Sequence, residues 1–182
     1  MQVSPEIESL VPYKPGKPIE ETKRELGLSE VIKLASNENP LGPSPKAVDA
    51  IKNHAENLSR YPDPSCFRLR EALSQKWQVR SDDIVIGNGS NELIDLLIRT
   101  FCEPGDKIIF PDKSFIAYGI CAQAARVGKK VIPIDRNFQW DADAFLEDFE
   151  KNHSSREKIL FLANPNNPTG TYLGKEQIDK IL

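Results

Sequence analysis

The chain has 182 residues, of which 39% are hydrophobic and 28% are charged, an ordinary composition for a globular protein. Its formal net charge of −3 gives no reason to expect a surface for nucleic acids or anionic membranes. Three widely spaced cysteines and two histidines argue against a disulfide framework and a metal centre. The chain lacks both a secretory signal and an apolar run of the roughly 20 residues that span a bilayer, so we expect a cytoplasmic protein.

The first 80 residues predict helices joined by polar loops. Residues 1–30 read as an arm with a short helix over residues 19–26, which Gly27 ends. Residues 31–34 are expected to be extended. Ser44 is expected to cap a helix that begins at Pro45 and runs towards Asn57. Ser65 is expected to cap the next helix, whose apolar positions repeat at helical spacing (Phe67, Leu69, Leu73 and Trp77).

From residue 84 onwards, strands and helices alternate. Strands are predicted over residues 84–86, 107–110, 130–134 and 159–163, and helices over residues 90–102, 115–127, 141–151 and from 174. This alternation predicts an α/β fold, with a mostly parallel sheet covered by helices on both faces. Leu182 has neither cap nor stop signal, so we expect the chain to be the N-terminal part of a longer polypeptide.

The predicted strand over residues 159–163 runs directly into the loop Asn-Pro-Asn-Asn-Pro-Thr-Gly, residues 164–170. In an open α/β sheet, loops at the carboxyl ends of the strands form the ligand crevice. Each proline restricts the residue before it, so we expect Asn164 and Asn167 to be held rigidly with their side-chain amides available to a ligand. An ordinary Asn/Pro-rich turn is the alternative.

A second loop, Gly87-Asn-Gly-Ser-Asn-Glu92, joins a predicted strand to a predicted helix. Its free N–H groups and the positive end of the helix dipole suit a phosphate group, although a tight turn with Ser90 as N-cap explains the residues equally well. The dinucleotide fingerprint is another alternative, with Asp112 near the position of the ribose-binding acid. Glu92 takes the place of its third glycine, however, and should spoil the close helix–strand packing of that fingerprint.

Several motifs together resemble the pyridoxal-phosphate (PLP) aminotransferases of fold type I. The Asn-Pro-x-Asn-Pro-Thr-Gly loop, the Gly87 loop, Arg60-Tyr-Pro62 and Pro104-Gly-Asp106 share the order and spacing found in those enzymes, as does Lys33-Leu-Ala-Ser-Asn-Glu-Asn-Pro-Leu-Gly-Pro-Ser-Pro45. The opening Leu10-Val-Pro-Tyr-Lys-Pro-Gly-Lys-Pro18 is similar to the histidinol-phosphate aminotransferase branch. The resemblance covers essentially the whole chain. It implies an N-terminal arm over residues 1–34 and an incomplete large PLP-binding domain over residues 35–182.

The resemblance also implies roles for individual residues. Gly89, Ser90 and Asn91 would hold the PLP phosphate, with Asn91 in place of the family's usual aspartate. An aromatic ring at Phe115 would stack on the cofactor, unless Phe115 or Tyr118 simply packs in the core. Asn167 would bind the cofactor's phenolic oxygen. The remaining implied residues are Tyr61, reaching the phosphate of the partner subunit in a homodimer, and, near the substrate, Tyr13 and Asn37.

The implied activity is transfer of an amino group between glutamate and imidazole-acetol phosphate in histidine biosynthesis. The lysine that forms the Schiff base, the aspartate on the pyridinium nitrogen and the arginine for the substrate carboxylate would follow Leu182, so we expect residues 1–182 alone to be inactive. Within the same fold, an aromatic amino-acid transaminase and a phosphothreonine decarboxylase are alternatives. A nicotinamide-dependent oxidoreductase and a non-catalytic ligand-binding domain are alternatives from other classes.

Overall fold

The computed structural model describes residues 3–182 and divides them into two compact units. One unit combines residues 3–13 with Gly87–Leu182, and the other is Lys14–Ile86.

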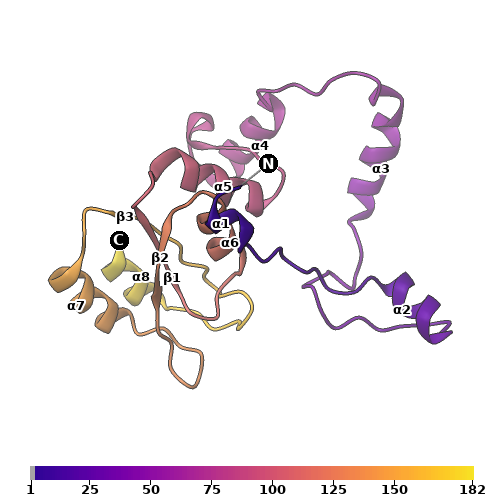
Figure 1. Ribbon diagram of the computed structural model, residues 1–182. Helices are drawn as coiled ribbons and strands as arrows, with labels where there is room; N and C mark the ends of the chain where they lie inside the picture. Colours follow the sequence, from indigo (N-terminus) through magenta and orange to yellow (C-terminus); the bar gives the residue numbers. More distant parts are fainter. Residues whose placement is uncertain (1–2) are drawn as a thin grey trace. The chain divides into compact units, whose positions relative to one another are not determined.

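Three parallel strands form the sheet of the first unit (Figure 1): β1 (Lys107–Pro111), β2 (Gly128–Ile132) and β3 (Glu157–Leu160), in the order β2-β1-β3. Successive side chains of a strand point to opposite faces of the sheet. In the central strand, Ile108 is 0% exposed and Ile109 is 2% exposed, so both faces of the sheet are covered. This burial confirms the α/β fold class expected from the alternation of elements.

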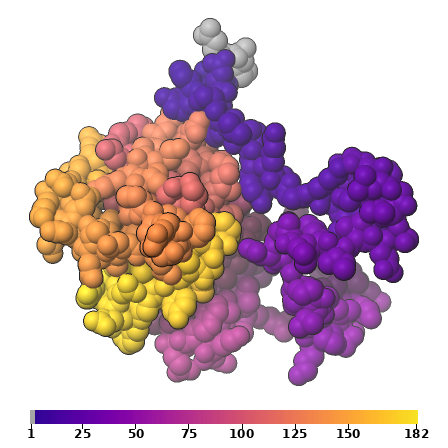
Figure 2. Space-filling view, turned by 90° about the horizontal axis from the view of Figure 1, so that it is seen from below, coloured from indigo at the N-terminus to yellow at the C-terminus, as the bar shows by residue number. Residues whose placement is uncertain are grey.

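Two helices cover each face of this sheet. Helices α5 (Ser90–Phe101) and α6 (Ala117–Ala124) pack with Ile108 in one apolar cluster. Helices α7 (Ala142–Asn152) and α8 (Lys175–Ile181) pack with Ile109 in the other. Figure 2 shows α7 and α8, in orange and yellow, side by side on the surface. Near the start of the chain, the short helix α1 (Pro5–Glu8), which the sequence did not predict, contacts α6.

Asp106, directly before β1, is a buried charged residue in this unit, with 3% of its surface exposed. Its Oδ2 accepts the backbone N–H of Glu103 at 2.9 Å, and its Oδ1 accepts from Nη1 of Arg156 at 3.2 Å. Hydrogen bonding from Glu103, and secondarily from Arg156, lowers the pKa of this carboxyl. Asp106 therefore fastens the turn before β1 to the start of β3.

The second unit consists of α2 (Ile19–Leu26), α3 (Pro45–His54) and α4 (Phe67–Trp77), with 3-10 helices at Ala55–Asn57 and Ser81–Asp83. Helix α2 has the predicted bounds and ends at Gly27, whose φ of 64° and ψ of 28° are left-handed. The unit exposes large apolar side chains instead of burying them, including Ile32, Leu34, Leu41, Leu58 and Tyr61.

Several predicted boundaries are wrong. Residues 84–86 form no strand, because none of the three strands in the described part of the chain pairs with them. Strand β3 ends at Leu160 instead of Ala163, because the neighbouring β1 ends at Pro111, which has no N–H to continue the ladder. The predicted helix over residues 115–127 is confined to α6.

Of the two predicted helix caps, Ser65 is wrong, and Ser44 is confirmed as the N-cap residue of α3. Ahead of α4, the N-cap is Cys66 and not Ser65, and the Asp63 carboxylate accepts the N–H groups of Ser65 at 2.9 Å and of Phe67, the first residue of the helix, at 3.1 Å. Ser44 precedes α3 as predicted, but its side chain makes no capping hydrogen bond. The Asp63 carboxylate, two residues before Ser65, thus accepts the helix N–H that the Ser65 hydroxyl was expected to accept.

Candidate functional site

The candidate site lies where the loops follow the parallel strands of the first unit. Parallel strands present their carboxyl ends at one edge of the sheet, where ligands bind in open α/β folds. Two of these loops are joined directly, because Nδ2 of Asn166, after β3, donates to the carbonyl of Lys113, after β1, at 3.1 Å. The structure therefore brings together the loop that carries Phe115 and the loop that carries Asn167.

The N-terminus of α5 provides unpaired donors. Gly89 is the N-cap, with φ 80° and ψ 175°, a conformation that essentially only glycine adopts. Among the described residues, no group accepts the backbone N–H of Ser90 or of Asn91. These two groups point along a helix of 12 residues, whose dipole places partial positive charge at the same end. An anion such as phosphate is the complementary ligand.

Glu92 has a role that the sequence did not predict. Its carboxylate turns back towards the loop and accepts the backbone N–H of Asn88 at 2.5 Å. A Cβ added at Gly87 would lie 2.9 Å from Glu92 Oε2 and 2.9 Å from Leu93 Cδ2, so a side chain here would make the ends of these two side chains move. Glu92 therefore satisfies one donor of the loop and leaves those of Ser90 and Asn91 for a ligand.

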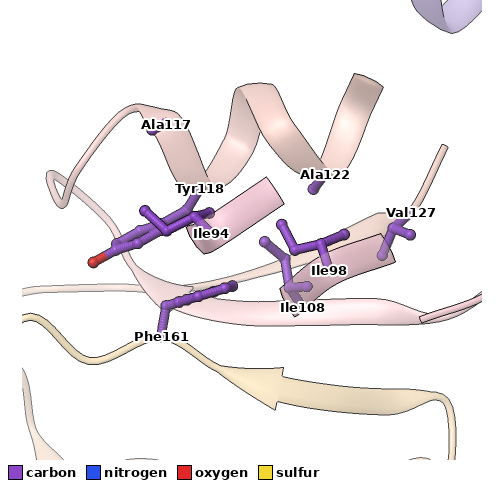
Figure 3. Packing of buried hydrophobic residues seen from close by; sticks show 8 residues of the cluster. All are labelled: Ile94, Ile98, Ile108, Ala117, Tyr118, Ala122, Val127 and Phe161. Atoms are coloured by element: carbon purple, nitrogen blue, oxygen red, sulfur yellow. The ribbon is translucent and has the colours of Figure 1, made fainter. Parts of the chain in front are cut away.

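The aromatic residues near the site divide into core and surface. Tyr118 is 8% exposed and stacks on Phe161 in the core (Figure 3), with ring centroids 4.6 Å apart and an interplanar angle of 14°. Burial raises the pKa of the Tyr118 phenol. Phe115 is only half-buried and meets Tyr118 edge-on at 5.8 Å. Tyr118 is thus a core residue, and Phe115 keeps part of its ring free for a flat ligand.

The asparagines after β3 differ in what their side chains contact. Asn164 does not have the free amide that we expected: its Nδ2 donates to the carbonyl of Leu173 at 3.1 Å, and its Oδ1 accepts the Leu173 N–H at 2.8 Å. Pairing with a backbone nine residues later is invisible in a local pattern. Asn167 is half-buried, and its side chain forms no hydrogen bond with any described residue. Of these two asparagines, only Asn167 is free to bind a ligand.

Asn166, the asparagine between them, was not singled out from the sequence. Its Nδ2 donates to Lys113 O and, at 2.7 Å, to Thr169 Oγ1. Thr169 and Thr171 hydroxyls lie 2.8 Å apart, and Thr171 donates to the carbonyl of Phe138 at 2.9 Å. Because Thr171 has only one hydroxyl proton, Thr169 must donate to it. This chain of hydrogen bonds runs in one direction and fixes the loop to the segment after β2. In the sequence, the only sign of this role was that the motif contains a third asparagine.

For the other predicted site residues, the structure gives the unit to which each belongs and its exposure or backbone conformation, but no contact with the site. Tyr13, at the end of the N-terminal segment of the first unit, is 52% exposed. Asn37 and Tyr61 belong to the second unit, where Asn37 has a φ of 49° and Tyr61 is fully exposed. Their roles stay predictions.

Within residues 3–182, no three His, Cys, Asp or Glu side chains gather as ligands of a metal ion would. No helix in this range has both the length and the apolar character that crossing a membrane requires.

Comparisons with known proteins agree with this geometry. The profile of the family described as aminotransferase class I and II matches residues 29–182. Histidinol-phosphate aminotransferase of Bdellovibrio bacteriovorus is 47% identical over 182 residues, which are 100% of this chain and 49% of that protein. The Moorella thermoacetica enzyme of the same name is 45% identical over 177 residues, 97% of this chain and 44% of that protein. The chain thus spans about half the length of these relatives.

Solved structures give the same result. The histidinol-phosphate aminotransferase of Sinorhizobium meliloti, in complex with pyridoxal-5'-phosphate, has a TM-score of 0.81 at 23% identity, covering 97% of this chain and 46% of that one. The Clostridium acetobutylicum histidinol-phosphate aminotransferase has a TM-score of 0.67 at 29% identity, covering 81% of this chain and 41% of that one. With its profile match and its fold, this chain belongs to the class I and II aminotransferase family.

Proposed function

We propose that the chain is part of a PLP-dependent transaminase that moves an amino group between glutamate and imidazole-acetol phosphate, in histidine biosynthesis. The observation that carries the PLP assignment is the pair of unpaired N–H groups at the start of α5, which a phosphate would satisfy. The choice among transaminases is supported by identities of 44% to 47% with histidinol-phosphate aminotransferases over 97% or more of the chain.

The residues of the first unit fit PLP. Gly89, Ser90 and Asn91 would hold the phosphate through backbone and side-chain donors. The free part of the Phe115 ring would lie against the cofactor ring, and Asn167 would donate to its phenolic oxygen. Bound PLP would supply an electron sink for the substrate's α-carbon. The protein residues named here bind and orient, and none of them transfers a proton.

A nicotinamide cofactor fits less well. The Gly87 loop would have to receive a pyrophosphate where the Glu92 carboxylate already binds the Asn88 N–H. Asp112, the candidate ribose-binding acid, is committed to Lys113, accepting its backbone N–H at 2.8 Å and its Nζ at 2.9 Å. Glu92 in place of the fingerprint's third glycine and an engaged acid both disfavour that reading.

We extend the proposal to a cytoplasmic homodimer with shared sites, and to the division into an arm (residues 1–34) and a large domain (residues 35–182). The support for the dimer is the apolar surface of the second unit and the fully exposed Tyr61, which would reach the partner's phosphate site. Tyr13 and Asn37 would lie near the substrate. Small molecules are the proposed substrates, namely a phosphorylated amino alcohol and glutamate.

The test uses the complete protein that contains this chain. A visible absorption band from lysine-bound PLP and turnover of histidinol phosphate in preference to phenylalanine and phosphothreonine are expected. Tyr61→Phe should weaken PLP binding by about 1.5–3 kcal/mol, because a charge-assisted hydrogen bond to the cofactor phosphate is lost. Tight NAD binding without the band would refute the cofactor assignment, and preference for phenylalanine in the unaltered protein would replace the substrate.

A further inference from the structure

The N-terminal segment of the first unit lies against helix α6. Its own helix, α1, has only four residues, Pro5–Glu8, and none of them is buried. Isolated helices shorter than about 12–15 residues are marginal in water, so α1 depends on a neighbour for its order. That neighbour is α6, which contacts α1 although the two helices lie far apart in the sequence (Figure 1).

The side chain of Gln123, in α6, attaches this segment at two points. Its Nε2 lies 2.9 Å from the carbonyl oxygen of Glu6 and 3.3 Å from Oγ of Ser9. A carbonyl can only accept, so the group that faces it is the NH₂. Ser9 Oγ accepts the second proton of this NH₂, because its own proton goes to the carbonyl of Pro5 at 2.7 Å. Both amide protons of Gln123 are therefore used to hold the segment.

Arg126, which follows the C-cap residue of α6, adds a third point of attachment. Its Nε donates to Oγ of Ser4 at 3.2 Å. Ser4 is the N-cap residue of α1, and Ser9 is its C-cap residue. Side chains from one end of α6 thus hold both ends of α1.

This attachment limits how far Tyr13 can lie from the candidate site. Tyr13 comes four residues after Ser9, a span of at most about 14 Å in an extended chain. Gln123 comes six residues after Ala117, a distance of about 9 Å along α6. Ala117 in turn is two residues after Phe115, the aromatic residue of the site. The anchored segment is therefore long enough to run back along α6 and bring Tyr13 to the end that begins beside Phe115.

We propose that Gln123 is a positioning residue for the substrate: by holding α1 against α6, it keeps Tyr13 at the side of the site that carries Phe115. Gln123 acts through the segment that it anchors and not by contact with the substrate. The effect on the substrate rests on the proposed function, in which Tyr13 lies near the substrate. The anchoring does not, because the hydrogen bonds within the first unit carry it by themselves.

The anchoring is tested by digesting the complete protein with endoproteinase Glu-C, which cleaves after glutamate. Cleavage after Glu8 requires α1 to open and leave α6, and mass spectrometry of the N-terminal fragment measures its rate. Gln123→Met removes both donors at a similar side-chain length. Gln123→Glu places a carboxylate, which can only accept, against the carbonyl of Glu6. Both variants should accelerate cleavage after Glu8 about fivefold or more.

Gln75→Glu is the matched control. It makes the same change of charge on α4, where the side chain of Gln75 forms no hydrogen bond with any described residue. Its cleavage after Glu8 should stay within about twofold of the unaltered protein. Unchanged cleavage in both Gln123 variants, or equal acceleration in the control, would overturn the anchoring, whatever the protein binds or catalyses.

The positioning role is tested by a double-mutant cycle with Tyr13→Ala, which removes the side chain whose place is in question. Gln123→Met should raise KM for histidinol phosphate about threefold or more, and should leave kcat and PLP affinity within about twofold. In the Tyr13→Ala protein the same substitution should raise KM little further, because the two residues act as one unit.

The outcomes separate this inference from the proposed function. An equal rise of KM in both backgrounds, or no rise although cleavage is accelerated, would overturn the positioning role and leave the anchoring standing. Absence of the lysine-bound PLP band and of histidinol phosphate turnover in the unaltered protein would refute the proposed function, and the positioning role with it. The rate of cleavage after Glu8 would still decide the anchoring.

Discussion

Gly89→Ala probes the proposed phosphate site most directly. Gly89 has φ 80° and ψ 175°, and an added Cβ would meet no atom within 4 Å. The cost of the methyl group is therefore backbone strain and not a clash. A residue other than glycine in this φ/ψ region has a backbone strain energy of about 1–3 kcal/mol.

That strain has two possible outlets, and both are measurable. If the loop keeps its conformation, the free energy of unfolding falls by about 1–3 kcal/mol. If the loop relaxes, the N–H groups of Ser90 and Asn91 turn away from the phosphate, and the same energy appears as a loss of PLP affinity of about 5- to 150-fold. The sum of the two effects is the predicted quantity.

The assay combines urea unfolding of the cofactor-free protein with equilibrium binding of PLP. Gly174→Ala is the matched control, because Gly174 also precedes a helix but has an ordinary φ of −70°, and its added Cβ would meet only Gln177 Oε1 at 4.0 Å. The control should change stability by about 0.5 kcal/mol or less. Wild-type stability together with wild-type PLP affinity in Gly89→Ala would refute the reasoning.

Three further predictions concern the core, pH dependence and the asparagine loop. Ile98→Ala should lower the free energy of unfolding by about 2–5 kcal/mol, because Ile98 is 0% exposed in its cluster. Leu97→Ala, at a site that is 43% exposed, should lower it far less. Equal losses in urea unfolding would contradict the assigned core. The donors around Asp106 lower its pKa, so its stabilising effect is present above the unfolded value of about 3.9 and is lost as the pH falls through the lower, folded value. Urea midpoints measured from pH 5 to 2 should fall less steeply in Asp106→Asn, and an unchanged slope would count against this. Asn167→Ala should weaken PLP binding about tenfold with little loss of stability. Asn164→Ala should lower the free energy of unfolding by about 1 kcal/mol, because its hydrogen bonds to Leu173 are lost. The reverse pattern in binding and unfolding assays would exchange the roles of the two asparagines.

The sequence by itself determined the features that depend on neighbours along the chain. Periodic apolar residues predicted α4 and α5, and Gly27 marked the end of α2, because helix periodicity and a left-handed stop are local properties. Alternating elements predicted the parallel sheet with two covered faces. The motif loops indicated the family and the regions of the candidate site.

Only the tertiary structure decided which polar groups remain free, because their partners lie far away in sequence. The side chain of Asn164 is hydrogen-bonded to the backbone of Leu173, nine residues later, and that of Asn166 donates to the carbonyl of Lys113, 53 residues earlier. The isolation of residues 84–86 has the same origin, since a strand exists only when another segment supplies its hydrogen bonds. A pattern of residue types records what each side chain can donate or accept, but the fold decides what it meets, and so leaves Asn167 and the donors of α5 for a ligand.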